Sequence, residues 1–154
     1  MYYRRKVLLA LVEAFGGNLE RTDCQKLLFL FCQHSKKNHY DFFPYKFGSF
    51  SLLAYYDKDR LTELGYLQDS QDFRLFQFPQ SFIDQLKTRD QILLRSLASK
   101  LKHLRGRDLI RYSYLNFPRY ISHSTILSDI LTKEEISQVS FWQQPDETPR
   151  LFTI

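Results

Sequence analysis

The stretch from Thr22 to about His34 constrains the fold most strongly, because its apolar residues cover most sides of a helix. Thr22 is followed three residues later by Gln25, which is the pattern of a capping box and predicts the start of that helix. The apolar positions are Cys24, Leu27, Leu28, Phe29, Leu30, Phe31 and Cys32. A helix that is apolar on so many sides has to be central, so the sequence predicts a helical domain packed around it.

The aromatic content favours a compact fold. The chain has 154 residues, which include 14 Phe, 10 Tyr and 1 Trp. Aromatic side chains each bury a large area, and this length suits one domain, or two small helical parts that share a core. The net charge of +5 permits nucleic-acid binding but does not require it.

The first 80 residues show the element order of a winged helix-turn-helix. Gly16 and Gly17 end the first helix, Ser49 or Ser51 can cap the third, and Gly65 closes it. The predicted elements are helices over residues 4–15, 22–34 and 51–64, a short strand or extended loop over 38–47, and a hairpin from 66–67 to 73–78. In such a module the third helix enters the major groove of DNA and the hairpin is the wing.

The rest of the chain is predicted to be helical up to a short tail. The expected helices are an apolar stripe of leucines over 93–104, a helix over 108–117, another over 122–131, and a short one that Thr132 caps. The fold prediction is therefore mainly α with a small β-hairpin. A winged-helix-like part (1–80) packs on a helical part (81–142), and a linker or tail (143–154) leads into a strand.

Three short motifs carry a resemblance to a known family. Residues 24–29 (Cys-Gln-Lys-Leu-Leu-Phe) are similar to a Leu-Gln-Lys-Leu-Leu-Tyr helix, and residues 44–51 to a Pro-Tyr-x-x-Gly-Pro segment. With Leu61 and residues 65–67, they resemble the Panacea, or SocA-like, antitoxin domains over roughly residues 22–67. The sequence departs from that pattern at Cys24 and Ser49. The resemblance implies neutralisation of a toxin by direct contact, and helix-turn-helix regions often accompany such domains.

A second resemblance concerns the end of the chain. Residues 151–154 (Leu-Phe-Thr-Ile) look like the first strand of a bacterial domain of unknown function that opens Leu-Phe-Thr-Ile-Gly-Tyr-Glu-Gly. Residues 105–112 look like a segment of the N-terminal half of such fusions. The resemblance implies a regulatory half whose partner domain is missing, split off or separately encoded.

The cysteines and histidines do not form a pattern typical of metal ligands. Cys24 and Cys32 lie eight residues apart on one predicted helix, about 12 Å along its axis, which excludes a disulfide. This spacing fits no common zinc pattern with His34 and His39, so we expect no metal and no cofactor. Free buried thiols favour a reducing compartment. The N-terminal apolar stretch is interrupted by Glu13, so it is expected to be a helix and not a signal peptide. The chain is therefore expected to be cytoplasmic.

No motif for catalysis stands out. There is no Gly-x-Ser-x-Gly, no Cys with a His and an acid at a recognisable spacing, and no glycine loop for phosphate. Asp57 and Asp59 are two residues apart and do not share a helix face, so they form no acid/base pair. Both are expected on a solvated helix surface. The sequence predicts a protein that is not an enzyme.

Two kinds of partner remain. In the first hypothesis a partner protein, a toxin or the separately encoded domain, is bound and occluded by Tyr45, Phe47, Phe50 and Tyr55, since aromatic residues dominate binding hot spots. The competing interpretation is that these rings fill the core.

The second hypothesis is a DNA-binding winged helix of a mobile-element or defence locus. Its contacts are Lys58 on the third helix, Arg74 on the wing, and Arg105, Arg107 and Arg111 on phosphates. Acidic residues beside Lys58 weaken this hypothesis, and the later arginines can equally form the wet face of an amphipathic helix.

Overall fold

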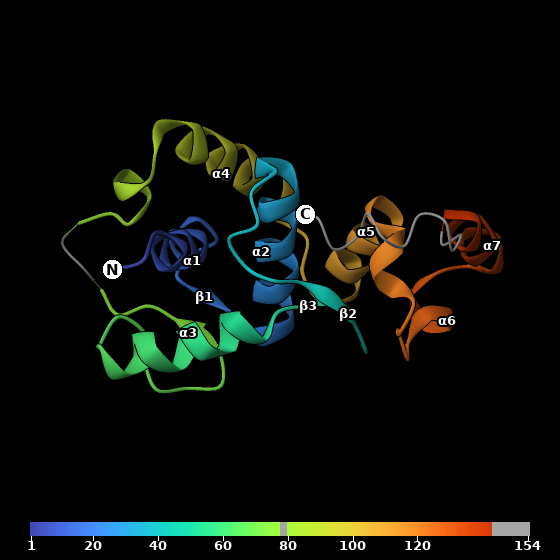
Figure 1. Ribbon diagram of the computed structural model, residues 1–154, viewed down its shortest axis with the longest axis horizontal. Coiled ribbons are helices and arrows are strands. Elements are labelled where there is room, and N and C mark those ends of the chain that lie inside the picture. The colour runs from blue at the N-terminus through green and yellow to red at the C-terminus, as the bar shows by residue number, and fades with distance from the viewer. Residues whose placement is uncertain (78–79, 143–154) are drawn as a thin grey trace.

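The computed structural model describes residues 1–77 and 80–142 (Figure 1). The predictions for residues 143–154, including the final strand, lie outside these residues. Within them the chain is mainly α-helical, with two small antiparallel sheets. The elements are α1 (Tyr3–Ala14), β1 (Asn18–Leu19), α2 (Arg21–Ser35), β2 (Phe43–Tyr45), β3 (Gly48–Phe50), α3 (Leu52–Glu63), β4 (Phe73–Arg74), η1 (Ile83–Gln85), α4 (Thr88–Leu101), α5 (Arg107–Asn116), η2 (Pro118–Ile121), α6 (Leu127–Ile130) and α7 (Lys133–Trp142).

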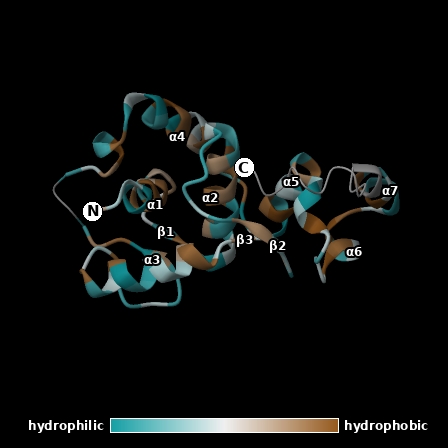
Figure 2. Cartoon of the chain, viewed as in Figure 1, coloured by the Kyte–Doolittle hydropathy of each residue, from teal (hydrophilic) through white to brown (hydrophobic). Residues whose placement is uncertain are grey.

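Helix α2 is the centre of the molecule, as its apolar surface predicts. It contacts α1, α4, α5 and β3, and its residues 27–31 are at most 1% exposed. In Figure 1, α1, α3 and α4 lie on one side of α2, and α5, α6 and α7 on the other. Figure 2 shows hydrophobic residues along α1 and α2, whereas α3 and α4 alternate with hydrophilic ones, as expected for helices with one face outward.

The start of α2 differs from the prediction. The helix begins at Arg21, and its N-cap is Glu20, which makes no side-chain cap bond. The capping box expected from Thr22 and Gln25 is therefore wrong. The Gln25 side chain instead donates from Nε2 to the Ser51 carbonyl (2.9 Å) and accepts from the Ser51 amide (2.8 Å). Ser51 is the cap of α3, accepting from the Ala54 amide, as one of the two predicted alternatives required.

The two sheets match the predicted extended segments in part. Strands β2 and β3 pair as a hairpin with Phe43 opposite Phe50. The hairpin predicted from residues 66–67 to 73–78 is reduced to a single bridge between Leu67 and Leu75, and Phe78 lies outside the described residues. Strand β4 instead pairs with β1, a non-local partner.

The C-terminal part has its own small core, which is formed by Ile110, Tyr114, Ile121, Ile130, Leu131 and Val139. The predicted helix over 122–131 is wrong for its first half, because α6 covers residues 127–130 alone. The predicted cap at Thr132 is confirmed. Its Oγ1 accepts from the Glu135 amide (3.2 Å), and Glu135 Oε1 accepts from the Thr132 amide (2.9 Å), which closes a capping box.

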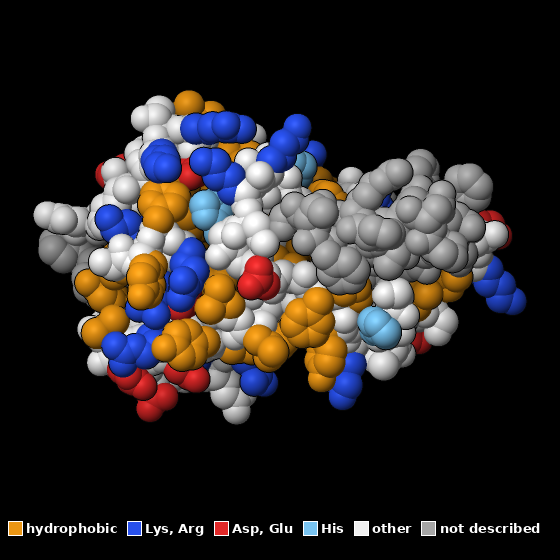
Figure 3. Space-filling model, in the orientation of Figure 1, with side chains coloured by type: hydrophobic (Ala, Val, Ile, Leu, Met, Phe, Trp, Pro, Cys, Tyr) orange, Lys and Arg blue, Asp and Glu red, His pale blue; other side chains and the backbone are white. Residues whose placement is uncertain are grey.

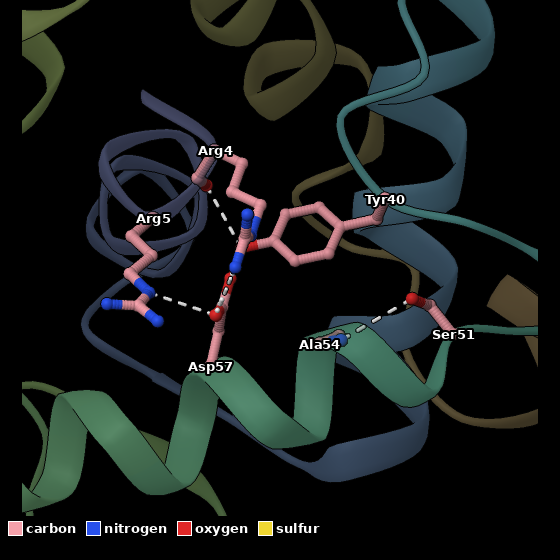
Figure 4. A network of polar contacts seen from close by, with 6 residues as sticks. All are labelled: Arg4, Arg5, Tyr40, Ser51, Ala54 and Asp57. Carbon is pink, nitrogen blue, oxygen red and sulfur yellow. Dashed lines mark hydrogen bonds and ion pairs between the residues drawn. The ribbon is translucent and has the colours of Figure 1, made fainter. Parts of the chain in front are cut away.

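A buried carboxylate ties α1, α3 and the loop after α2 together (Figure 4). Asp57 is fully buried, and its oxygens accept from Arg4 (2.8 and 3.1 Å), Arg5 (2.9 Å) and the Tyr40 hydroxyl (2.8 Å). The expectation of a solvated Asp57 is therefore wrong. Burial alone raises the pKa of this carboxyl, but the hydrogen bonds from Arg4, Arg5 and Tyr40 outweigh it and lower the pKa below its usual value.

Candidate partner-binding site

A pocket of about 230 Å³ opens where the β2–β3 hairpin meets the starts of α2 and α3. We call it the hairpin pocket. Its lining residues are Arg21, Thr22, Gln25, Lys26, Tyr45, Phe47, Ser49, Phe50 and Tyr55. All four aromatic residues predicted to anchor a partner protein are therefore brought together around one cavity.

The aromatic rings form a continuous row from the hairpin to the core. The centroids of Tyr45 and Phe50 are 5.1 Å apart, those of Phe50 and Tyr55 are 5.4 Å apart, and those of Tyr55 and the buried Phe73 are 6.2 Å apart. These distances are typical of favourable aromatic pairs. The row has an outer end, because Tyr45 is 42% exposed, and Phe47 beside it is 46% exposed, whereas Phe50 and Tyr55 are half-buried. The four rings thus neither fill the core completely nor lie free on the surface.

A buried lysine on α2 holds the hairpin through a hydrogen bond. Lys26 is 2% exposed, and its Nζ donates to the Ser49 carbonyl at 2.7 Å. Burial lowers the pKa of Lys26 to about 7, so the cation is held at a cost that one hydrogen bond offsets incompletely.

Two further polar groups of the pocket lack partners within the described residues. The hydroxyl of Ser49 is buried and makes no hydrogen bond there, although buried hydroxyls are normally paired. Arg21 is exposed in the first turn of α2 and makes no ion pair within the same part of the chain. Its charge lies close to Tyr55, where it opposes the rise in the Tyr55 pKa that burial causes.

The hairpin is held in place from the C-terminal side as well. Gly48 has a φ of +91°, and a Cβ at this position would lie 2.7 Å from Cε1 of Tyr114 in α5. The Thr125 amide donates to the Lys46 carbonyl at 2.9 Å. Together with the Gln25 bonds to Ser51, these contacts hold the walls of the pocket on both sides.

All five cations predicted to hold DNA make hydrogen bonds within the protein. Lys58 is buried, donates to the Ser70 carbonyl (2.7 Å) and lies 5.7 Å from the Phe73 ring centroid, so it does not lie on the exposed face of α3 that a base contact needs. Arg111 pairs with Glu135 and donates to the Ile130 carbonyl (3.1 Å).

The other three predicted cations also make contacts within the protein. Arg107 bonds the Asp129 carbonyl, and Arg105 bonds the Leu104 carbonyl (2.6 Å) while its guanidinium lies over Phe15. Arg74 is exposed on β4 and donates to Asn18 Oδ1 (3.2 Å). The structure does not gather these arginines with the hairpin pocket.

The outward face of α3 is apolar at its start and acidic at its end. Its exposed residues are Leu52, Tyr56, Asp59 and Glu63, which follow helical spacing. Arg60 pairs with Glu63. Figure 3 shows the corresponding pattern, with hydrophobic side chains along the edge formed by α3 and the hairpin and acidic ones at the far end of α3.

The cysteines lie as predicted and stay free. Cys24 and Cys32 are buried and unpaired, and burial raises the pKa of both thiols, that of Cys32 to about 12. Within residues 1–77 and 80–142, His, Cys, Asp and Glu form no group of three able to hold a metal ion. None of the helices in this range is both long and apolar enough to span a membrane.

Lys26 and Arg21 were not assigned to the site from the sequence. A signal for Lys26 exists, because it lies three and four residues before Phe29 and Leu30 and so shares their buried helix face. Arg21 could not be found in this way, because the predicted helix start at Thr22 placed it outside the helix.

Comparisons with protein-family models, with curated proteins and with solved structures find no match to this chain.

Proposed function

We propose that this chain is a non-enzymatic regulatory binding module, antitoxin-like in action, which binds a partner protein through the hairpin pocket and occludes it. One observation carries the proposal. Four aromatic side chains from a hairpin and a helix converge on one cavity, and Tyr45 and Phe47 remain nearly half exposed there.

The construction of the pocket suits recognition of a protein. Aromatic anchors supply most of the energy at protein interfaces. Because Gln25, Gly48 and the Thr125 contact hold the hairpin already, little conformational freedom is lost when a partner binds. Leu52 and Tyr56, both more than half exposed on α3, extend the apolar surface beside it.

The resemblance to Panacea antitoxins supports the same proposal. Residues 44–51, which carry part of that resemblance, supply most of the hairpin and several walls of the pocket. A toxin, or a separately encoded C-terminal domain, is therefore the partner we expect.

DNA binding by a winged helix is the second candidate. The order α1, β1, α2, α3, β4, which the β2–β3 hairpin interrupts between α2 and α3, and the pairing of β1 with β4 favour that arrangement. Two observations weigh against α3 as a DNA-reading helix: its outward stripe ends in Asp59 and Glu63, and Lys58 is buried. We therefore place protein binding first.

Co-purification tests the proposal. Tagged wild-type chain, a Tyr45→Ala/Phe47→Ala double variant and a Phe76→Ala control are expressed in cells that naturally make the chain, and bound proteins are quantified by mass spectrometry. Phe76 is 48% exposed and lies outside the pocket lining, so it matches Phe47 in exposure. We expect one protein to be retained by wild type and control and lost from the double variant. Retention of the same proteins by all three chains would contradict the proposal. Recovery of nucleic acid alone, in an amount that falls steeply as salt rises, would also contradict it.

A further inference from the structure

We propose that the hairpin pocket receives a carboxylate of the partner protein together with an adjacent apolar side chain, with Arg21 and Lys26 pairing the carboxylate and the aromatic walls holding the apolar group. This inference rests on the proposed function and adds the chemistry of the segment that is bound.

The charged residues of the pocket lining favour a carboxylate. The described lining contains two cations, Arg21 and Lys26, and no carboxylate. The acidic residue in the first turn of α2, Asp23, is turned elsewhere, since its Oδ1 accepts from the Gly106 amide at 2.8 Å. A carboxylate in the pocket would therefore meet positive charge without a competing acid from the lining.

The polar groups of the pocket have unused hydrogen-bonding capacity that a carboxylate can fill. A lysine ammonium has three N–H donors, and within the described residues Nζ of Lys26 uses one, toward the Ser49 carbonyl. The hydroxyl of Ser49 has no partner within the same residues, and the guanidinium of Arg21 offers five further donors. The donors of Lys26 and Ser49 are buried, unlike those of the exposed Arg21. Buried donors without acceptors destabilise a fold, so an acceptor that arrives with a ligand would use the free capacity of Lys26 and Ser49.

The shape and lining of the pocket are a further argument. A cavity of about 230 Å³ has room for one carboxylate and one medium-sized apolar side chain. The rings of Tyr45, Phe50 and Tyr55 form its apolar side, while Arg21 and Lys26 lie on α2. A peptide segment with an acidic residue next to an aromatic or aliphatic one presents both groups together.

Two small probes that differ in charge alone test this chemistry. Phenylacetate carries an aromatic ring and a carboxylate, and phenylacetamide is its neutral counterpart. Each is titrated into the isotope-labelled full chain, and the shifts of backbone amide signals at residues 45–55 are followed by NMR. We expect phenylacetate to bind at least tenfold more tightly, because the amide cannot pair with the two cations.

Three variants locate the source of that preference. Arg21→Gln and Lys26→Met should each reduce the preference at least threefold. Arg89→Gln should leave it unchanged, because Arg89 is also an exposed arginine in the first turn of a helix, α4, away from the pocket. Arg21 is exposed, so its variant tests the inference even where Lys26→Met folds poorly.

The outcomes separate the inference from the proposed function. Equal binding of the two probes, or no shift at residues 45–55 with either, overturns the carboxylate assignment, while co-purification still decides whether a partner protein binds there. Phenylacetate binding without any co-purifying protein would overturn both, because the pocket would then serve a small molecule.

Discussion

Two buried polar clusters in this molecule differ in how completely their hydrogen-bonding groups are used. Around Asp57, each carboxylate oxygen accepts two hydrogen bonds, from two arginines and a tyrosine. In the hairpin pocket, Lys26 has one acceptor within the described residues and the Ser49 hydroxyl has none. The first cluster lies under α1 and α3, and the second lies beside exposed rings.

This difference indicates different roles. A closed network that satisfies every oxygen of a buried carboxylate fixes the packing of the helices that supply it. An open one leaves unmet hydrogen-bonding capacity that a binding partner can use. The number of partners that a buried polar group has, rather than its burial alone, separates the structural cluster from the candidate site.

Removing Asp57 should have the largest effect on stability. Asp57→Ala leaves the guanidinium groups of Arg4 and Arg5 without their buried partner, so the free energy of unfolding should fall by about 3–5 kcal/mol. Urea unfolding followed by circular dichroism measures this. Asp59→Ala on the exposed face of the same helix is the control and should change it by about 0.5 kcal/mol or less. Equal effects would mean that the Asp57 network is not structural.

Gly48→Ala should have the next largest effect, about 3 kcal/mol, because a left-handed φ and the close ring of Tyr114 both oppose a side chain. Gly65→Ala has a similar φ of +85° but nothing within 4 Å, so it should cost about 1 kcal/mol. The difference between the two variants isolates the contact between the hairpin and α5. If thermal and urea unfolding show no difference, that contact does not hold the pocket.

Lys26 in the hairpin pocket should make the free energy of unfolding depend on pH. Burial lowers the pKa of Lys26 to about 7, whereas an unfolded lysine keeps its proton up to pH of about 10.4. Between these two values unfolding takes up a proton, so the free energy of unfolding rises with pH across this window. The gain is lost again as pH falls back through the folded pKa of about 7.

The measurement compares wild type with Lys26→Met by urea unfolding at pH 7 and pH 9, below the range in which the tyrosines titrate. Relative to the variant, wild type should gain about 2 kcal/mol on going to pH 9. A difference in the free energy of unfolding that stays constant between pH 7 and pH 9 would show that Lys26 titrates like an exposed lysine. Lys26 would then not be a buried cation with unused hydrogen-bonding capacity.

The sequence predicts the local elements of the fold, but not which side chains meet in the two clusters. The central helix α2, the Ser51 cap and the Thr132 capping box follow from local patterns, and local patterns also singled out Tyr45, Phe47, Phe50 and Tyr55. That these four rings meet at one cavity depends on the hairpin folding back over α2, which spacing along the chain does not encode.

The buried charges were missed for a related reason. Asp57 lies between Ala54 and Leu61 on the core-facing stripe of α3. Charged residues are rarely buried, so the sequence predicts this one at the surface. Its partners Arg4 and Tyr40 come from α1 and from the loop after α2. The pairing of β1 with β4 is non-local in the same way.

Truncating the pocket rings should have the smallest effect on stability. Phe47 is nearly half exposed, so Phe47→Ala should change the free energy of unfolding by about 1 kcal/mol or less, as should Phe76→Ala. Phe47→Ala alone should weaken partner binding. A large loss of stability in Phe47→Ala would favour the interpretation in which these rings serve the core.

Photo-crosslinking tests directly whether the hairpin pocket contacts a partner protein. A photoreactive phenylalanine analogue is placed at position 47, and at position 76 for comparison, in the full chain within the cells that make it, and adducts are identified by mass spectrometry after illumination. We expect one discrete protein adduct from position 47 that is absent from position 76. Adducts of equal yield and identity from both positions, or adducts to DNA instead of protein from position 47, would contradict it.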